Sequence, residues 1–393
     1  QAKVLTSAQL GALGTEQVAA IATDDFALLS TNALRGLDSE QISALSTDQV
    51  VAFSSQQAGS LTTQQVSGLR TDQIVALQTE DLRALGTAAI RSLDTEQVAA
   101  LTTDQVPTLS TAQIAALATT PANQLGAIGT DDIKAMTTDQ FRTLSSTQLR
   151  GFGTEQISQI DTDDLQALST NALRGLSTEQ IAALTTDQIV GLSTLQVATL
   201  TTQQLVGLRT DQIANLASDD LRALGTASIR SLSTEQLNAL TTDQVGQLST
   251  TQVSALSTTQ VAGMTTEDLQ AITTDHAKVL SSAQLRAMGT DQIAALGTDD
   301  LAQLSTNAVR GLTSEQVGAL TTDQIVALAT VQVASLTTQQ LVGLRTDQIA
   351  NLASDDLRAL GTAAIRSLGT DQLNALTTDQ VPLLTTAQVA ALS

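Results

Sequence analysis

One eight-residue pattern repeats along almost the whole chain and constrains its fold more than any other feature. A typical copy, TTQQVSGL, runs from Thr62 to Leu69. When the octad is numbered 1 to 8 so that it ends on this leucine, 14 octads fill residues 6–117 and 33 fill residues 129–392. Position 8 is Leu in 39 of the 47 octads, and position 2 is Thr or Ser in all of them. Such repetition predicts a stack of small units rather than two or three globular domains.

The period of eight excludes a continuous helix and a continuous strand. In a long helix, each eight-residue step would rotate the apolar positions 5 and 8 by about 80°, so no apolar face would survive. In a strand, positions 5 and 8 would point to opposite sides. A helix of one to one and a half turns, broken and re-aimed in each octad, places both positions on one face. The sequence therefore predicts an all-α solenoid of very short helices around a continuous aliphatic core.

Each octad position has an expected role in this solenoid. Positions 5 and 8 should point inward, position 7 should stay small where the chain turns, and positions 1, 3, 4 and 6 should face outward. The predicted core is represented by Val66, Leu69, Ile74, Leu77, Leu205, Leu208, Leu341 and Leu344.

The hydroxyl at position 2 is expected to cap the helix of its octad and to bind the next coil. Ser and Thr are favoured N-caps, but Asp and Asn cap equally well and never occupy this position. Because a hydroxyl donates as well as accepts, we expect a ladder of hydroxyls that donate to the neighbouring coil. Where position 1 is Ser or Thr, Gln or Asp at position 4 should also reach back as a capping box. The predicted ladder is represented by Thr63, Thr71, Thr79, Thr202, Thr210, Thr338 and Thr346.

Residues 1–393 are predicted to form a single array with one irregularity. Residues 118–128 form an 11-residue unit, and its Thr120-Pro121 pair predicts one lengthened helix with Pro at its first position. A longer period of 136 residues, or 17 octads, relates residues 169–176 to residues 305–312. Arg150, Arg174 and Arg222 recur at spacings of three and six octads, which hints at three octads per coil without fixing that number. Because the sequence starts and stops inside an octad, we expect it to be a window from a longer array.

Composition restricts the function to a few classes. The net charge of −21 argues against binding to nucleic acid, which requires clustered Lys and Arg. No apolar run is long enough for a membrane span, and no cysteine is present to form a disulfide or a thiolate site. The single histidine, His276, has no partner for metal binding or catalysis, so we expect no enzymatic activity.

The residue pattern suggests three further kinds of site. Paired acids at positions 3 and 4 would suit Ca²⁺, although the same pairs also complement helix dipoles. The regular rows of threonine suggest a second hypothesis, binding to ice. Leu195 and Val331 are apolar at the otherwise polar position 3, as a lateral contact between solenoids would require. No other cofactor is expected. The representative Ca²⁺ candidates are Asp24, Asp25, Asp131, Asp132, Asp163, Asp164, Asp299 and Asp300.

The unit LTTDQVPTL at residues 101–109 resembles the octapeptide arrays of very large repeat proteins predicted at the surface of Gram-negative bacteria. The resemblance covers essentially the whole chain and implies no catalytic residues. It implies an extracellular or surface-bound structural protein, a segment of a fibre or surface layer that assembles with itself end to end or side by side. The alternative is the stalk of a secreted adhesin whose binding domains lie outside this sequence.

Overall fold

The computed structural model describes residues 2–120 and 122–392, and every regular element in them is a helix. There are 46 α-helices of four to six residues and three short 3-10 helices. The chain divides into two compact units, residues 1–200 and 201–393, and the octad pattern continues through both. The all-α solenoid predicted from the octad period is confirmed.

Each α-helix begins at octad position 2 and ends at position 5, 6 or 7, except α14 in the irregular unit. For example, α8 spans Thr63–Ser67 and α9 spans Thr71–Ala76. Leu77 after α9 is extended, with φ −59° and ψ 128°, and Thr62 before α8 is extended, with φ −77° and ψ 162°. Extended residues at positions 8 and 1 therefore break the chain between octads and turn it toward the next helix.

The N-cap lies at position 1, so the predicted cap at position 2 is wrong by one residue. In α8 the Thr62 hydroxyl accepts the backbone N–H of Gln65 at 3.3 Å, and the Thr62 N–H donates to Gln65 Oε1 at 3.0 Å. This is the reciprocal capping box that the sequence predicted between positions 1 and 4. Position 2 is the first residue inside the helix.

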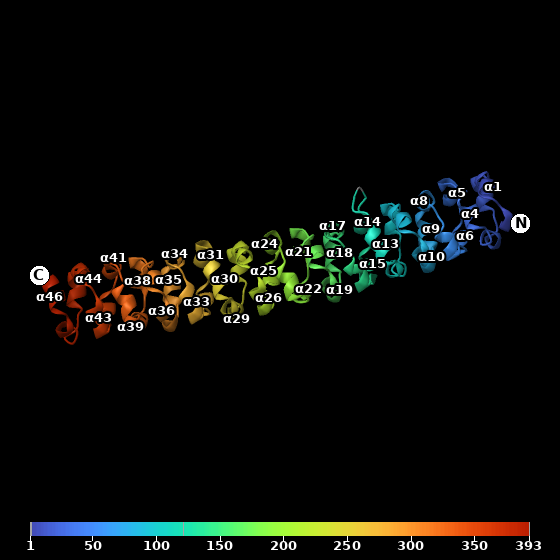
Figure 1. Ribbon diagram of the computed structural model, residues 1–393. Coiled ribbons are helices and arrows are strands. Elements are labelled where there is room, and N and C mark those ends of the chain that lie inside the picture. Colours follow the sequence, from blue (N-terminus) through green and yellow to red (C-terminus); the bar gives the residue numbers. More distant parts are fainter. Residues whose placement is uncertain (1, 121, 393) are drawn as a thin grey trace. The chain divides into compact units, whose positions relative to one another are not determined.

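Within each unit, helices pack against the third helix before or after them. In the first unit α1 (Ser7–Gly11) contacts α4 (Thr31–Leu34), and in the second unit α38 (Ser314–Ala319), α41 (Thr338–Val342) and α44 (Thr362–Ser367) contact in sequence (Figure 1). Hydrogen bonds between coils join residues 25, 28 or 31 apart. One coil is therefore slightly longer than three octads, which answers the question that the arginine spacing left open.

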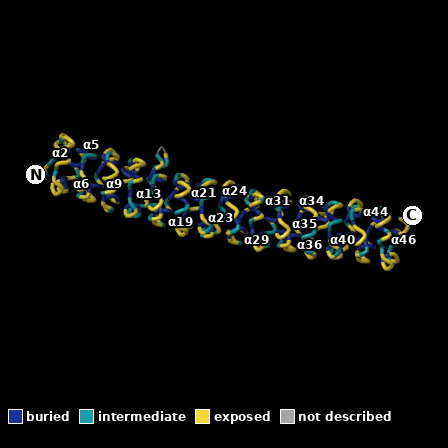
Figure 2. The backbone as a smooth tube through the Cα atoms, turned by 180° about the vertical axis from the view of Figure 1, so that it is seen from behind, coloured by how far each residue is buried: buried dark blue, intermediate teal, exposed yellow. Residues whose placement is uncertain are grey.

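Most residues of positions 5 and 8 are buried in the interior of each unit. Figure 2 shows buried segments of backbone alternating with exposed ones along the coils. Val66 and Ile74, both at position 5, are completely buried, and Leu69 and Leu77, at position 8, are nearly so. All eight residues chosen to represent the core are buried. Each short helix thus contributes two apolar side chains to a continuous core, and neighbouring coils bury what no single octad could.

The 11-residue unit does not form the predicted lengthened helix. Its helix, α14 (Gln124–Ala127), has only four residues and is capped by Asn123, whose side chain accepts the N–H of Gly126 at 3.2 Å. Pro121, half of the predicted helix start, lies outside the described residues. Gln124 still accepts the N–H of Ala118 and donates to the carbonyl of Leu93 at 2.6 Å, as the position-4 glutamines of regular octads do. The three extra residues therefore separate Ala118 from Gln124, whose equivalents in a regular octad are three residues apart.

Two octads with proline at position 6 form 3-10 helices instead of α-helices. These are η2 (Val106–Thr108) and η3 (Val381–Leu383), which contain Pro107 and Pro382. Proline lacks the N–H that would extend an α-helical turn. The buried side chain of Gln105 nevertheless keeps its bonds to the preceding coil, so the stack continues through this octad.

Candidate functional site

The residue that ties successive coils together is the glutamine at octad position 4. Gln65 is 1% exposed, and its Nε2 donates to the carbonyls of Leu34 at 2.6 Å and Leu37 at 2.8 Å in the preceding coil. Its Oε1 meanwhile accepts the N–H of Thr62 at the start of its own helix. We call this arrangement the glutamine clamp.

The clamp forms because very short helices leave most of their backbone groups without partners. The first N–H groups and the last C=O groups of any helix lack intrahelical partners, and in a helix of five residues these are nearly all of them. A primary amide carries both an acceptor and two donors. Position-4 glutamine therefore satisfies the N–H that opens its own helix and the carbonyls that close a helix in the coil before it.

The clamp recurs in both units with the same geometry. Gln188 donates to Ile157 and Ile160 at 2.9 and 2.7 Å, and Gln340 donates to Val309 and Leu312 at 2.8 Å each. The prediction that position 4 faces outward is therefore wrong. A polar side chain was expected at the surface, whereas its hydrogen-bonding capacity makes it the main polar contact between coils.

His276 takes the place of glutamine in one octad and preserves the clamp. Its Nδ1 accepts the N–H of Thr273 at 3.3 Å, and Nε2 lies 2.6 Å from the carbonyl of Leu248. These partners require the neutral tautomer with the proton on Nε2. The single histidine of the chain is therefore a structural replacement for glutamine.

The seven hydroxyls chosen to represent the predicted ladder do not form it, although Thr138, also at position 2, forms a hydrogen bond with Asp164 of another coil. Six of its seven representatives are exposed and Thr79 is half-buried. Among the described residues none of the seven side chains has a hydrogen bond to another coil, and the hydroxyl of Ser92 reaches only the backbone carbonyl of Thr63. The predicted tie between coils exists, but position 4 makes it.

The close approach of two coils also explains why position 7 is glycine in some octads. A Cβ added to Gly175 would lie 2.2 Å from the carbonyl oxygen of Ser146, a position-2 residue 29 residues earlier. Gly36 stands in the same relation to Ser7, and Gly343 to Ser314. A glycine at position 7 over a serine at position 2 thus lets two coils touch backbone to backbone.

The acid pairs proposed for Ca²⁺ are divided between surface and interior. Asp163 is exposed, whereas Asp164 at position 4 is buried, and Asp299 and Asp300 differ in the same way. Burial is the main cause that raises the pKa of Asp164 and of Asp300. Asp24 and Asp25 are both exposed.

Asp131 and Asp132 complete the set, and burial also raises the pKa of Asp132. Within residues 2–120 and 122–392, no three acidic or histidine side chains gather as a metal site would require. In these pairs the position-3 carboxylate is exposed to solvent, and the position-4 carboxylates of Asp132 and Asp300 accept the backbone N–H of Gly129 and Gly297.

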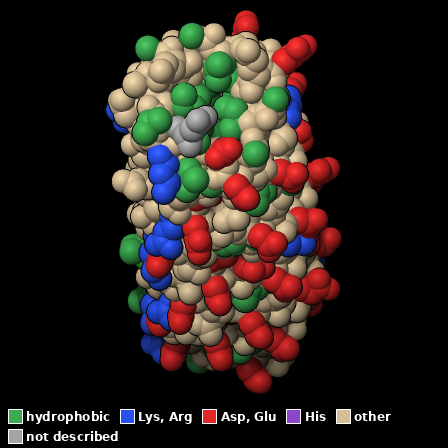
Figure 3. Space-filling view, turned by 90° about the vertical axis from the view of Figure 1, so that its right-hand side faces the viewer, with side chains coloured by type: hydrophobic (Ala, Val, Ile, Leu, Met, Phe, Trp, Pro, Cys, Tyr) green, Lys and Arg blue, Asp and Glu red, His purple; other side chains and the backbone are tan. Residues whose placement is uncertain are grey.

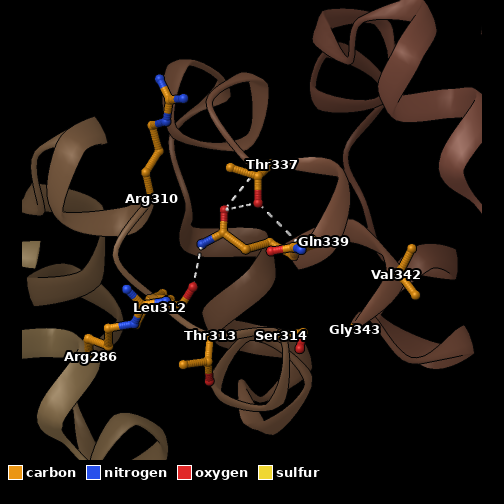
Figure 4. A pocket seen from close by; sticks show the side chains of 10 residues that line it. Arg286, Arg310, Leu312, Thr313, Ser314, Thr337, Gln339, Val342 and Gly343 are labelled. Carbon is orange, nitrogen blue, oxygen red and sulfur yellow. Dashed lines mark hydrogen bonds between the residues drawn. The ribbon is translucent and has the colours of Figure 1, made fainter.

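A surface groove of 670 Å³ lies in the second unit (Figure 4). Arg286 and Arg310 lie on one side of it, and Thr313, Thr337 and Val342 on the other. Its lining contains no acid and no histidine, which are the usual groups of acid–base catalysis. No helix of the described residues is long and apolar enough to cross a membrane.

Comparison with known families assigns the repeat. A family model described as the ALTTAQ repeat matches nine segments, which together cover more than half of the chain. The chain belongs to the ALTTAQ repeat family. The matched segments are residues 18–55, 74–111, 125–159, 157–194, 213–250, 261–298, 277–304, 293–330 and 349–386.

Other comparisons add no function to this ALTTAQ repeat chain. The search of curated proteins found no match. The solved structure of APUM23-GGAAUUGACGG is 11% identical, with 96% of this chain and 93% of that chain covered, at a TM-score of 0.17. So low a score carries no argument about fold or ligand.

Proposed function

We propose that this ALTTAQ repeat chain is a non-enzymatic structural protein, a segment of an extracellular or surface-bound fibre or layer that associates with copies of itself. The observation that carries the proposal is the glutamine clamp. Most octads after the first coil devote a buried glutamine to holding the coil before it, as Gln41, Gln188 and Gln388 do. A chain built in this way maintains its length and periodicity, which is what a structural element must provide.

The described surface supports the same conclusion. The cavities are open grooves along the coils, and the one acid-rich motif serves caps and solvation. The resemblance to octapeptide arrays of bacterial surface proteins supports the extracellular location, and a chain without cysteine is compatible with it.

Negative-stain electron microscopy and sedimentation velocity of the purified chain test the proposal. We expect association that grows with protein concentration and yields elongated or sheet-like assemblies. Discrete single particles at every concentration would contradict self-association and leave the stalk of a larger adhesin as the better account. Unfolding should not respond to a chelator, because no described cluster provides enough acidic ligands for Ca²⁺.

A further inference from the structure

Octad position 3 is usually acidic, but about once per coil an octad has no acid there. Position 3 is Asp or Glu in 28 octads and neither in the other 19. In the first unit, Thr147, Asn171 and Leu195 are successive non-acidic residues, each three octads from the next. Every octad between them has an acid at position 3. Because a coil is slightly longer than three octads, these non-acidic positions fall on one side of the unit.

Helix contacts confirm that the non-acidic octads are stacked. In the first unit α17 (Ser146–Arg150) contacts α20 (Thr170–Leu173), which contacts α23 (Thr194–Ala198). In the second unit α31 (Thr258–Gly263), α34 (Ser282–Ala287), α37 (Thr306–Val309) and α40 (Thr330–Ala334) contact in the same order. We call the surface of such octads the acid-free face of each unit.

The acid-free face also carries arginines that lack an acidic partner. Arg150 and Arg174 occupy position 6 of adjacent coils in the first unit, and Arg286 and Arg310 do so in the second. The described salt bridges include none of these four side chains.

Two basic residues outside the face each form a salt bridge with an acid three residues before them. Arg142 pairs with Asp139 at 2.6 Å and Lys278 pairs with Asp275 at 2.9 Å. Figure 3 shows several Lys and Arg side chains along one edge of the visible surface, with Asp and Glu side chains beside them and over the rest of it. The face thus presents uncompensated positive charge on a strongly acidic chain.

A matching cavity lies on the acid-free face of each unit. The cavity of the first unit has a volume of 260 Å³, and that of the second has 310 Å³. Every residue of the first has its counterpart 136 residues later in the second, with Ala283 in place of Thr147 as the one difference in residue type. The shared lining consists of one serine, one asparagine, one glycine and two arginines. These side chains are rich in hydrogen-bond donors and include no acid, so the cavities suit carboxylates.

We propose that the acid-free face binds the acidic surface of a second copy of this chain. The remaining octads display an exposed acid at position 3 once or twice per coil, as Asp163 and Asp299 do. Both partners carry the same repeat, so arginines on one copy and carboxylates on the other recur at the same interval along the contact. Guanidinium groups also bind carboxylates in a bidentate manner.

A net charge of −21 disfavours an anionic polymer as the occupant, because the rest of the chain would repel it. The contact joins two different surfaces, so each bound copy still offers one of each, and association is open-ended. This inference rests on the proposed self-association and identifies the surface and the charge pattern that produce it.

The test compares two fourfold variants that remove the same charge from the same octad position. The face variant replaces Arg150, Arg174, Arg286 and Arg310 with Gln. The control variant replaces Arg83, Arg142, Arg222 and Arg358 with Gln, all at position 6 of octads that have an acid at position 3. Sedimentation velocity at low and high salt measures association, and circular dichroism verifies that both variants are folded.

We expect the wild type and the control variant to associate at low salt and to dissociate as salt screens the contact. The face variant should associate about tenfold more weakly or not at all. Equal association of the two variants would overturn the inference while leaving the proposed function intact. A wild type that never associates would overturn both. Binding of the wild type to heparin or DNA that depends on the face, without self-association, would replace the second copy with a polyanion.

Discussion

Replacing Gln65 with Glu tests the glutamine clamp with a change of a single atom. The carboxylate keeps the acceptor that Thr62 N–H requires, but it loses both donors to the carbonyls of Leu34 and Leu37. The carbonyl of Leu34 also accepts the N–H of Leu37 at 3.1 Å, so only the carbonyl of Leu37 is left without a donor. One such buried carbonyl costs about 1–3 kcal/mol, which is the local destabilisation that we predict. The carboxylate also faces two oxygen atoms in a site that is 1% exposed, which adds repulsion.

The neighbouring Gln64 is a matched control, because it is exposed on the same helix and has the same side chain. Gln64→Glu makes the same change of charge and should alter stability by no more than about 0.5 kcal/mol. Comparison of the two variants separates the clamp from the general effect of adding charge to an acidic chain.

The effect of Gln65→Glu should depend on pH in a defined direction. Burial against carbonyl oxygens favours the neutral carboxyl, so its pKa in the folded chain should lie above the value of about 4.3 in the unfolded chain. The loss of stability caused by Gln65→Glu should therefore be smallest below the unfolded value of about 4.3 and should grow as pH rises through the folded pKa. The protonated carboxyl can also donate one hydrogen bond to a carbonyl of the preceding coil. Gln64 is exposed, so Gln64→Glu should show no such dependence on pH.

Hydrogen exchange measured by mass spectrometry is the suitable assay, because repeat proteins open locally rather than in one two-state step. Peptides spanning residues 30–45 and 62–69 report on both sides of the clamp. At neutral pH their protection should fall by a factor of ten or more in Gln65→Glu, since about 1.4 kcal/mol corresponds to tenfold, and should stay unchanged in Gln64→Glu. Equal protection in the two variants would refute the argument that buried glutamine ties the coils together.

Two further predictions concern buried acids and close backbone contacts. Asp164→Asn should stabilise its coil at pH 7 and have little effect near pH 3. Burial raises the pKa of Asp164, so the stability that the protonated carboxyl contributes is lost as pH rises. Hydrogen exchange measured as a function of pH checks this, with the exposed Asp163→Asn as the control. Gly175→Ala should destabilise the chain by about 1–3 kcal/mol, because the new Cβ would meet the carbonyl of Ser146. Gly86→Ala should not, because no atom lies within 4 Å of its new Cβ. Denaturant unfolding followed by hydrogen exchange measures both variants, and equal losses of stability would show that the coils do not touch at Gly175.

The fold class and the core followed from the octad period, because positions 5 and 8 can share a face only in a short helix. Val66 and Leu69 were assigned to the interior on this ground, and both are buried. The exact cap was missed because Thr occupies both position 1 and position 2 in octads such as the one that begins at Thr62. Gly and Asp also occur at position 1, and both are favoured N-cap residues, so they indicate that the cap lies at position 1.

Gln65 was assigned to the surface because polarity alone gives no information on where a side chain finds hydrogen-bond partners. A clearer signal was present in the contrast between positions. Position 3 varies among Asp, Glu, Gln, Asn, Thr and apolar residues, whereas position 4 is Gln in most octads. A surface position has no need of one particular amide, but a clamp that must both accept and donate does.

The acid-free face was also encoded in the sequence, but it could not be recognised without the length of a coil. Thr147 and Asn171 are unremarkable in a linear reading, since acids are simply missing from their octads. Only the stacking of α17 on α20 shows that they are neighbours. Contacts between distant residues, and not local propensity, determine this surface.

The central claim, that one coil is slightly longer than three octads, is most directly tested by a disulfide between engineered cysteines. Ala84 lies 25 residues after Gly59, and its Cβ is 3.6 Å from where a Cβ on Gly59 would be, within the range of about 3.5–4.5 Å found across disulfides. The chain has no cysteine of its own, so a cross-link found by mass spectrometry is unambiguous. Gly59→Cys with Ala84→Cys should form the bond readily, and Gly59→Cys with Ala76→Cys, one octad earlier at the same repeat position, should not. Equal cross-linking of the two pairs, or cross-linking of only the second, would contradict the coil described for this chain.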